Sequence, residues 1–194
     1  RRAEELVLAA GSIGTVLRLA AVYGSRVKGN YRDLVTALAA GKYVSIGAGA
    51  NRRTLVHEHD AAAAAAIAAT HPGAVGRVYN VTDGSCHELR AIVAAICAAL
   101  ARPHPRGHVP APPVRLLAHA GDRLARVAGR PGWPLPHRLD KYFDDVCVDG
   151  SRISRELGFQ PERTLVSGWR EAVESMRRAG QLPPVRRKPG PDSH

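Results

Sequence analysis

Two histidines, His57 and His59, lie two residues apart in a segment with the composition of an extended strand. Side chains at this spacing point to the same side of a strand, so both imidazoles could reach one metal ion. A zinc-type site needs at least a third ligand, and the sequence offers none at a suitable spacing. We therefore predict no bound metal.

Other groups of reactive side chains are also incomplete. Ser151 lacks the Gly-x-Ser-x-Gly context that exposes a nucleophilic serine. The adjacent carboxylates Asp144 and Asp145 are interpreted as part of a solvated loop rather than as an acid–base pair. The sequence thus contains no complete nucleophilic or acid–base site.

The three cysteines are widely spaced along the chain, at Cys86, Cys97 and Cys147. Their odd number and spacing fit neither a disulfide framework nor a zinc motif. We predict that all three are unpaired thiols.

Two pairs of glycines are candidates for a dinucleotide-binding loop. Gly11 and Gly14 precede a predicted strand, whereas phosphate-binding glycines follow a strand and open a helix. Gly47 and Gly49 precede an extended segment. All four are interpreted as turn glycines.

The net charge is +11, from 28 basic and 17 acidic residues. Apart from a cluster at Arg186, Arg187 and Lys188, the charge is spread along the chain. Diffuse positive charge attracts polyanions in general, whether nucleic acid or a diphosphate. Because no nucleic-acid recognition signature accompanies it, we expect no nucleic-acid partner.

The elements that must position these residues alternate between strands and helices. Extended segments are predicted at residues 15–23, 42–46, 53–57 and 77–81. Helices are predicted at 1–10, 30–41, 60–71, 86–101, 114–128, 151–157 and 165–179, with Asn30 and Asp60 as N-caps. This order indicates an α/β protein with few, short strands.

Length and composition give the broad class. The 194 residues are enough for one domain or part of a larger one, and no apolar run is long enough to span a bilayer. The chain opens in a charged helical pattern without a signal peptide. We expect a cytoplasmic fragment, with residues 1–182 ordered and 183–194 forming a disordered, basic, Pro-rich tail.

Five segments follow one another in a characteristic order. They are LRLAAVYG at 17–24, RTLVHEHD at 53–60, VYNVTDG at 78–84, VDGSRISRELGFQP at 148–161 and GWRE at 168–171. Together they resemble the NAD-dependent epimerase/dehydratase family, the extended short-chain dehydrogenases that include UDP-glucose 4-epimerase. One departure is Ala21, where the family commonly has an Asn that touches the substrate.

The resemblance implies the carboxyl-terminal part of a Rossmann-type α/β fold, with an incomplete parallel sheet and a small, mostly helical substrate-binding region. It also implies hydride transfer with NAD, assisted by a Tyr and a Lys four residues apart on a helix. No tyrosine of this chain has a lysine four residues later: Tyr23, Tyr31, Tyr43, Tyr79 and Tyr142. We expect the Tyr–Lys pair and most NAD contacts upstream of Arg1, and no catalysis by this portion alone.

For binding, the resemblance implies that Arg53 holds the substrate diphosphate, with Arg52 as the alternative. A planar guanidinium suits this task because it can donate two parallel hydrogen bonds. The remaining implied contacts are Leu19 and Val22 to the nicotinamide, Asn30 and Leu34 to the sugar nucleotide, Val44 and Ile46 to the base, and Arg138 to a phosphate.

The predicted function is therefore substrate binding within an NAD-dependent sugar-nucleotide epimerase or dehydratase that is UDP-glucose 4-epimerase-like. The resemblance is compatible with a homodimer and leaves the oligomeric state open. Two alternatives stay open. One is an NAD(P)H-dependent reductase or hydroxysteroid-type dehydrogenase of the same fold, favoured slightly by Ala21 and the apolar region 109–117. The other is a non-enzymatic, basic nucleotide- or nucleic-acid-binding module.

Overall fold

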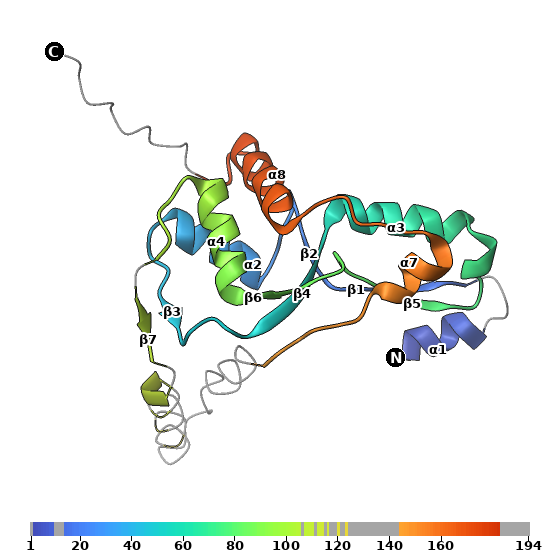
Figure 1. Ribbon diagram of the computed structural model, residues 1–194, viewed down its shortest axis with the longest axis horizontal. Helices are drawn as coiled ribbons and strands as arrows, with labels where there is room; N and C mark the ends of the chain where they lie inside the picture. The colour runs from blue at the N-terminus through green and yellow to red at the C-terminus, as the bar shows by residue number, and fades with distance from the viewer. Residues whose placement is uncertain are drawn as a thin grey trace.

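The computed structural model of the protein describes residues 2–9, 14–105, 107–110 and 144–182, together with a few single positions between 112 and 123. Figure 1 shows an elongated molecule. At one end, which we call the sheet lobe, a strand pair is flanked by helices. At the other end, which we call the helical lobe, three helices pack together.

Short strands run through the middle of the molecule and into both lobes. They are β1 (Val16–Leu19), β2 (Ala21–Tyr23), β3 (Ser45–Ile46), β4 (Arg52–His57), β5 (Val78–Val81), β6 (Cys86–Glu88) and β7 (His108–Val109). The parallel pairs are β1–β5, β2–β4 and β3–β7, and β6 pairs antiparallel with β4. The mostly parallel pairing confirms the predicted α/β class.

Helices cover the strands and build the two lobes. They are α1 (Arg2–Ala9), α2 (Asn30–Ala39), α3 (Glu58–Thr70), α4 (Leu89–Leu100), α7 (Ser151–Leu157) and α8 (Leu165–Arg178), with a 3-10 turn η1 (Pro72–Ala74). No helix among the described residues is long and apolar enough to cross a membrane. The predicted helix at 114–128 and the predicted tail at 183–194 lie almost entirely outside the described residues.

The predicted single strand over 15–23 is divided in two. β1 pairs with β5, whereas β2 pairs with β4, so the chain changes partner at Ala20. The main-chain N of Ala20 still donates to the oxygen of Val81, at 2.9 Å. The helix predicted from Cys86 begins only at Leu89, because residues 86–88 form β6 and pair with β4.

The helical lobe has a core of large side chains. Trp169 of α8 is fully buried and stacks on Tyr23, with ring centroids 4.5 Å apart. α4 and α8 pack against each other, and the Arg177 side chain donates to the last main-chain oxygens of α4, at Ala99 and Leu100. These bonds satisfy oxygens that have no partner inside the helix.

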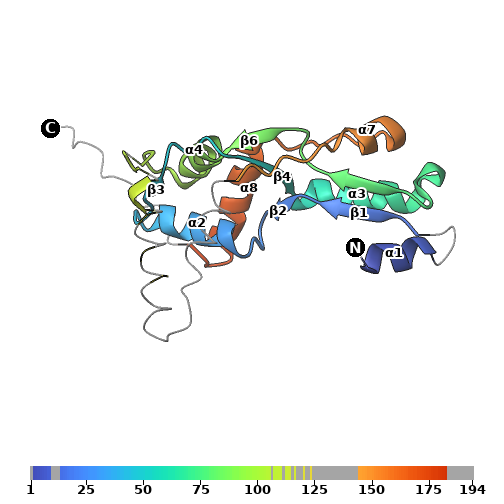
Figure 2. The ribbon, with the colours of Figure 1, turned by 90° about the horizontal axis from the view of Figure 1, so that it is seen from below.

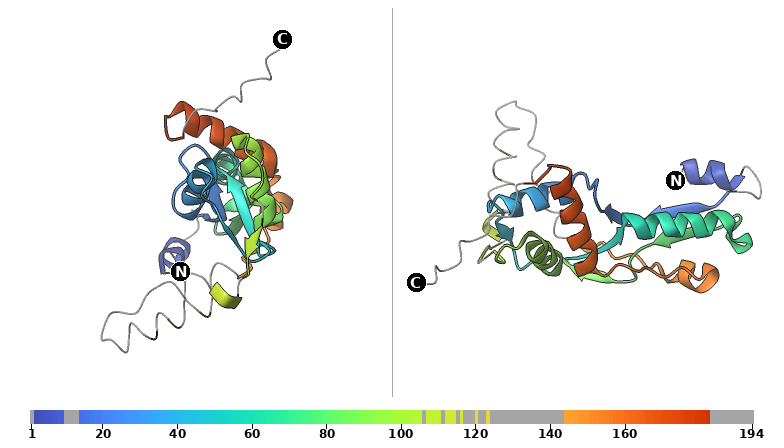
Figure 3. Two further views of the ribbon diagram at one scale, coloured as in Figure 1. Left: turned by 90° about the vertical axis from the view of Figure 1, so that its left-hand side faces the viewer. Right: turned by 90° about the horizontal axis from the view of Figure 1, so that it is seen from above.

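The sheet lobe is packed around α3, which is built mostly of alanine. Ala61, Ala64 and Ala68 are buried against the β4–β5 side of the lobe, where Tyr79 is fully buried. Figures 2 and 3 show α1 and α7 on opposite sides of the β1–β5 pair. Small side chains allow α3 to approach the strands closely.

Both predicted N-caps are wrong. α2 begins at Asn30 itself, after Gly29, and no side chain caps it. α3 begins at Glu58, and the Nδ1 of His57 accepts the capping hydrogen bond from the His59 main chain, at 3.4 Å. The buried carboxylate of Asp60 instead accepts two main-chain hydrogen bonds from residues 162 and 163, each of 3.2 Å, because burial makes these donors its available partners.

Candidate functional site

Arg53, the predicted phosphate-binding residue, lies in β4 with a partly buried side chain. Its Nη1 donates hydrogen bonds to the main-chain oxygens of Arg52, at 2.9 Å, and Asp144. A guanidinium has five N–H donors in a rigid plane, and the two bonds from Nη1 help to fix its orientation.

The segment that accepts from Arg53 runs beside β4. The main-chain N of Thr54 donates to Val146 at 3.0 Å, and the N of Val146 donates to Arg52 at 2.9 Å. The Asp145 carboxylate accepts from the main-chain N of Arg52 at 2.7 Å. Asp144 and Asp145 are exposed, as predicted, but they are anchored on β4.

Tyr31 of α2 lies on the same side as Arg53. Its partly buried ring is tilted against Trp169, with centroids 6.0 Å apart. Burial raises the pKa of Tyr31, and the positive charge of Arg53 acts in the opposite direction. The Arg53 charge therefore acts on the Tyr31 phenol. Tyr31 was not among the predicted site residues, although it is adjacent to Asn30.

The other predicted substrate residues of the helical lobe differ in exposure. Asn30 is exposed in the first turn of α2, whereas Leu34 packs against the core of the lobe. Val44 is 61% exposed. Ile46 is partly buried in β3, where it pairs with Val109.

Arg138, the predicted second phosphate contact, lies outside the described residues. Its role stays a prediction.

Leu19 and Val22, the predicted nicotinamide contacts, lie on the open surface of the central strands. Their exposed fractions are 48% and 40%. Leu19 ends β1 and Val22 lies in β2. Their contact with the nicotinamide stays a prediction.

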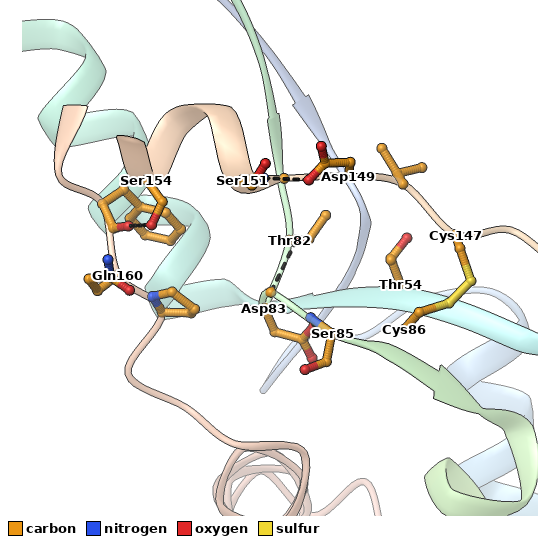
Figure 4. Close-up of a pocket in the computed structure, with 15 residues that line it drawn as sticks. Thr54, Thr82, Asp83, Ser85, Cys86, Cys147, Asp149, Ser151, Ser154 and Gln160 are labelled. Carbon is orange, nitrogen blue, oxygen red and sulfur yellow. Dashed lines mark hydrogen bonds between the residues drawn. A yellow bond between two sulfur atoms is a disulfide. The ribbon is translucent and has the colours of Figure 1, made fainter. Parts of the chain in front are cut away.

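A pocket of about 700 Å³ opens where β4, the turn after β5 and the segment leading into α7 meet (Figure 4). Its wall combines hydroxyl and carboxylate side chains with apolar ones, among them Val148, Phe159 and Pro161. Asp149 accepts from the main-chain N of Ser151 at 2.8 Å, and Asp83 accepts from that of Ser85 at 3.1 Å. The second carboxylate oxygen of Asp83 lies 2.6 Å from His87 Nε2. These bonds hold the turns that shape the pocket.

A disulfide between Cys86 and Cys147 forms part of the same wall (Figure 4). The prediction of unpaired thiols is wrong for these two and confirmed for Cys97, which is free and buried. β4 brings the pair together, since Cys86 lies opposite Thr54 in β6 and Cys147 follows Val146. Their Cα atoms lie 5.7 Å apart, although the two residues are separated by 61 positions in the sequence. The positions of the cysteines in the sequence therefore do not indicate the pairing.

His57 and His59 do not form a metal site in the described part of the chain. No group of three potential ligands occurs among those residues. His57 is buried, and its Nε2 has no hydrogen-bond partner there, whereas His59 is exposed on α3 with its Nε2 3.7 Å from Glu171. Burial lowers the pKa of His57, and the Glu171 carboxylate partly opposes this shift. The capping bond and the packing of His57 give it a structural role.

Comparisons with known proteins agree with the resemblance. Residues 2–82 match the NAD dependent epimerase/dehydratase family. The chain is 25% identical over 154 residues to N-acetyl-alpha-D-glucosaminyl-diphospho-ditrans,octacis-undecaprenol 4-epimerase of Escherichia coli O157:H7, covering 79% of this chain and 46% of that protein. It is 35% identical over 109 residues to the uncharacterized protein YbjS of Escherichia coli K12, covering 56% of this chain and 32% of that protein.

Among solved structures, UDP-glucose 4-epimerase of Thermotoga maritima, determined with UDP-glucose, is similar with a TM-score of 0.60 and 19% identity. The match covers 85% of this chain and 46% of that structure. The chain thus spans less than half the length of each of these proteins. The α/β fold and the ordered motifs agree with these matches, and residues 2–82 are similar to the NAD-dependent epimerase/dehydratase family.

Proposed function

We propose that the protein binds a sugar joined to a diphosphate, as the substrate-binding portion of an NAD-dependent sugar-nucleotide epimerase or dehydratase. The observation that carries this proposal is the oriented guanidinium of Arg53. Main-chain oxygens of Arg52 and Asp144 accept hydrogen bonds from its Nη1. An oriented Arg binds a diphosphate with two parallel charge-assisted hydrogen bonds.

The surroundings of Arg53 support a diphosphate ligand in two further ways. The net charge of +11 attracts an anionic substrate over a distance. Exposed Asn30 and Val44 offer an amide and an apolar contact in the same lobe, a combination suited to a polar sugar and a flat base. The E. coli 4-epimerase similar to this chain is named for a sugar carried on a diphosphate.

When bound, NAD supplies the hydride acceptor and donor of such a reaction. Leu19 and Val22 fit one face of its nicotinamide, because both are apolar and exposed. The chain contains no glycine-rich phosphate loop, so we assign the phosphates of NAD to residues outside it. Within the family we favour a reaction at the sugar C4, like that of UDP-glucose 4-epimerase.

Calorimetric titration of the complete natural protein with UDP-glucose and UDP-N-acetylglucosamine, in the presence of NAD, tests the proposal. We expect Arg53→Ala to weaken sugar-nucleotide binding about 10- to 100-fold, the range for a lost hydrogen bond to a charged group. Affinity for NAD should not change.

Arg52→Ala is the matched control, because Arg52 is adjacent but exposed; it should change the affinity less than twofold. If Arg52→Ala weakened sugar-nucleotide binding and Arg53→Ala did not, the diphosphate contact would be assigned to Arg52. Retained NAD binding without affinity for either sugar nucleotide would contradict the proposal and favour a reductase acting on another ketone.

A further inference from the structure

We propose that the Cys86–Cys147 disulfide is a redox-controlled lock on the Arg53 site. The bond joins β6 to the segment 144–148, and that segment supplies the Asp144 oxygen which orients Arg53. β4 lies between the two halves of the lock, with β6 on one edge and Val146 on the other. The bond therefore links the two segments that pair with Arg53 on either side of β4.

The two cysteines of the disulfide are more accessible to solvent than the third cysteine. Cys147 is exposed and Cys86 is partly buried, whereas Cys97 is buried and free. A thiol reductant from solvent can therefore reach the sulfur of Cys147. Burial also raises the pKa of Cys97, which keeps that thiol protonated and unreactive.

The exchange is balanced with a dithiol as reductant. One thiolate of the dithiol attacks the Cys147 sulfur, forms a mixed disulfide and releases the Cys86 thiolate, which takes up a proton. The second thiol of the reductant then displaces Cys147 and closes the reductant's own disulfide. The protein gains two thiols, and the dithiol is oxidised by two electrons.

Reduction removes the only covalent restraint that the structure shows on this segment. Main-chain bonds between Val146 and β4, of 2.9 and 3.0 Å, and the carboxylate bond from Asp145 still hold it. Apart from the bond donated by the buried Thr54, these bonds join exposed residues and compete with water. The reduced segment therefore spends more time away from β4, and in those states Arg53 loses its Asp144 acceptor.

The consequence for binding rests on the proposed function. If Arg53 is oriented in only a fraction of the molecules, the apparent dissociation constant rises in inverse proportion to that fraction. We expect the oxidised protein to bind UDP about tenfold more tightly than the reduced protein.

The test uses the complete protein purified without reductant. Peptide mass mapping under non-reducing conditions should find Cys86 linked to Cys147, and a dithiol should convert both to alkylatable thiols. Hydrogen exchange of the amide of Val146 should accelerate about tenfold or more on reduction, because opening exposes it. Absence of the cross-link, or exchange unaffected by reduction, overturns the lock.

UDP titration of both redox forms completes the test. Cys86→Ser and Cys147→Ser should bind UDP as weakly as the reduced protein in either redox condition. The control Cys97→Ser should keep the full redox response. Equal UDP affinity in the two forms overturns the effect on Arg53. If neither form binds UDP, the proposed function fails, while the cross-link and the exchange rate still decide whether the lock exists.

Discussion

The helical lobe and the sheet lobe bury their cores with different side chains. In the helical lobe, Trp169, Tyr23 and Met176 fill the space between helices and strand. In the sheet lobe, Ala61, Ala64 and Ala68 of α3 bring backbone close to backbone (Figure 1). Large side chains supply stability through buried area, whereas small ones supply it through close approach.

The lobes also differ in what they leave on the surface. Near the sheet lobe, the central strands expose Leu19 and Val22 at 48% and 40%. The helical lobe instead covers the end of β2, where Tyr23 is 1% exposed under α8. The open strand face offers room for a ligand or another part of the protein, and the closed end of β2 holds Tyr31 and Trp169 in place.

Breaking the helical core should have the largest effect. Trp169→Ala removes a fully buried indole that stacks on Tyr23. We expect the free energy of unfolding of the complete protein to fall by about 3–5 kcal/mol. Urea unfolding followed by circular dichroism measures the change.

Val166→Ala is the matched control on the same helix, because Val166 is 50% exposed. Its cost should stay within about 0.5 kcal/mol. A similar cost for both variants would mean that α8 is stabilised by helix propensity rather than by its buried face.

Overfilling the sheet lobe should have an intermediate effect. Ala64 is fully buried in α3, so Ala64→Leu forces the helix away from the strands. We expect a loss of about 1–3 kcal/mol in the free energy of unfolding. The neighbouring Ala63→Leu is exposed and should cost less than about 0.5 kcal/mol. If both variants were tolerated equally, the alanines of α3 would not be close-packed.

Local signals predicted the helices at the end of the chain well. α7 and α8 match the predictions at 151–157 and 165–179 to within a residue. The signals for them, a glycine after the last helical turn and an amphipathic pattern, depend only on residues close together in the sequence. The division of β1 from β2 was missed. It depends on which distant strand lies beside each residue, and a local pattern carries no such information.

The candidate site was predicted only in part, for the same reason. Arg53 was predicted because it lies within a family segment, and its role stays a prediction. Tyr31 was missed because its packing depends on the position of Trp169 in α8, far along the chain. The Cys86–Cys147 pair was missed because β4 brings together residues that are 61 positions apart.

The smallest expected effect concerns pH at the junction of the two lobes. Burial lowers the pKa of His57 below 6.5, while Glu171, Asp60 and Glu58 act in the opposite direction. The unfolded chain exposes this imidazole, with a pKa of about 6.5, so it binds more protons than the folded protein as pH falls below that value. The free energy of unfolding should therefore decrease from about pH 6.5 downwards, until the folded pKa is passed.

His57→Asn should flatten this slope, because Asn can still cap α3 but does not titrate. Urea unfolding at pH 7.5 and pH 5.5 compares the two proteins. His104→Asn, at an exposed position outside both cores, should keep the slope of the parent. An equally steep slope in His57→Asn would assign the pH dependence to other groups. His57 would then join the lobes through packing alone, by its edge-on contact with Tyr23 at 5.3 Å.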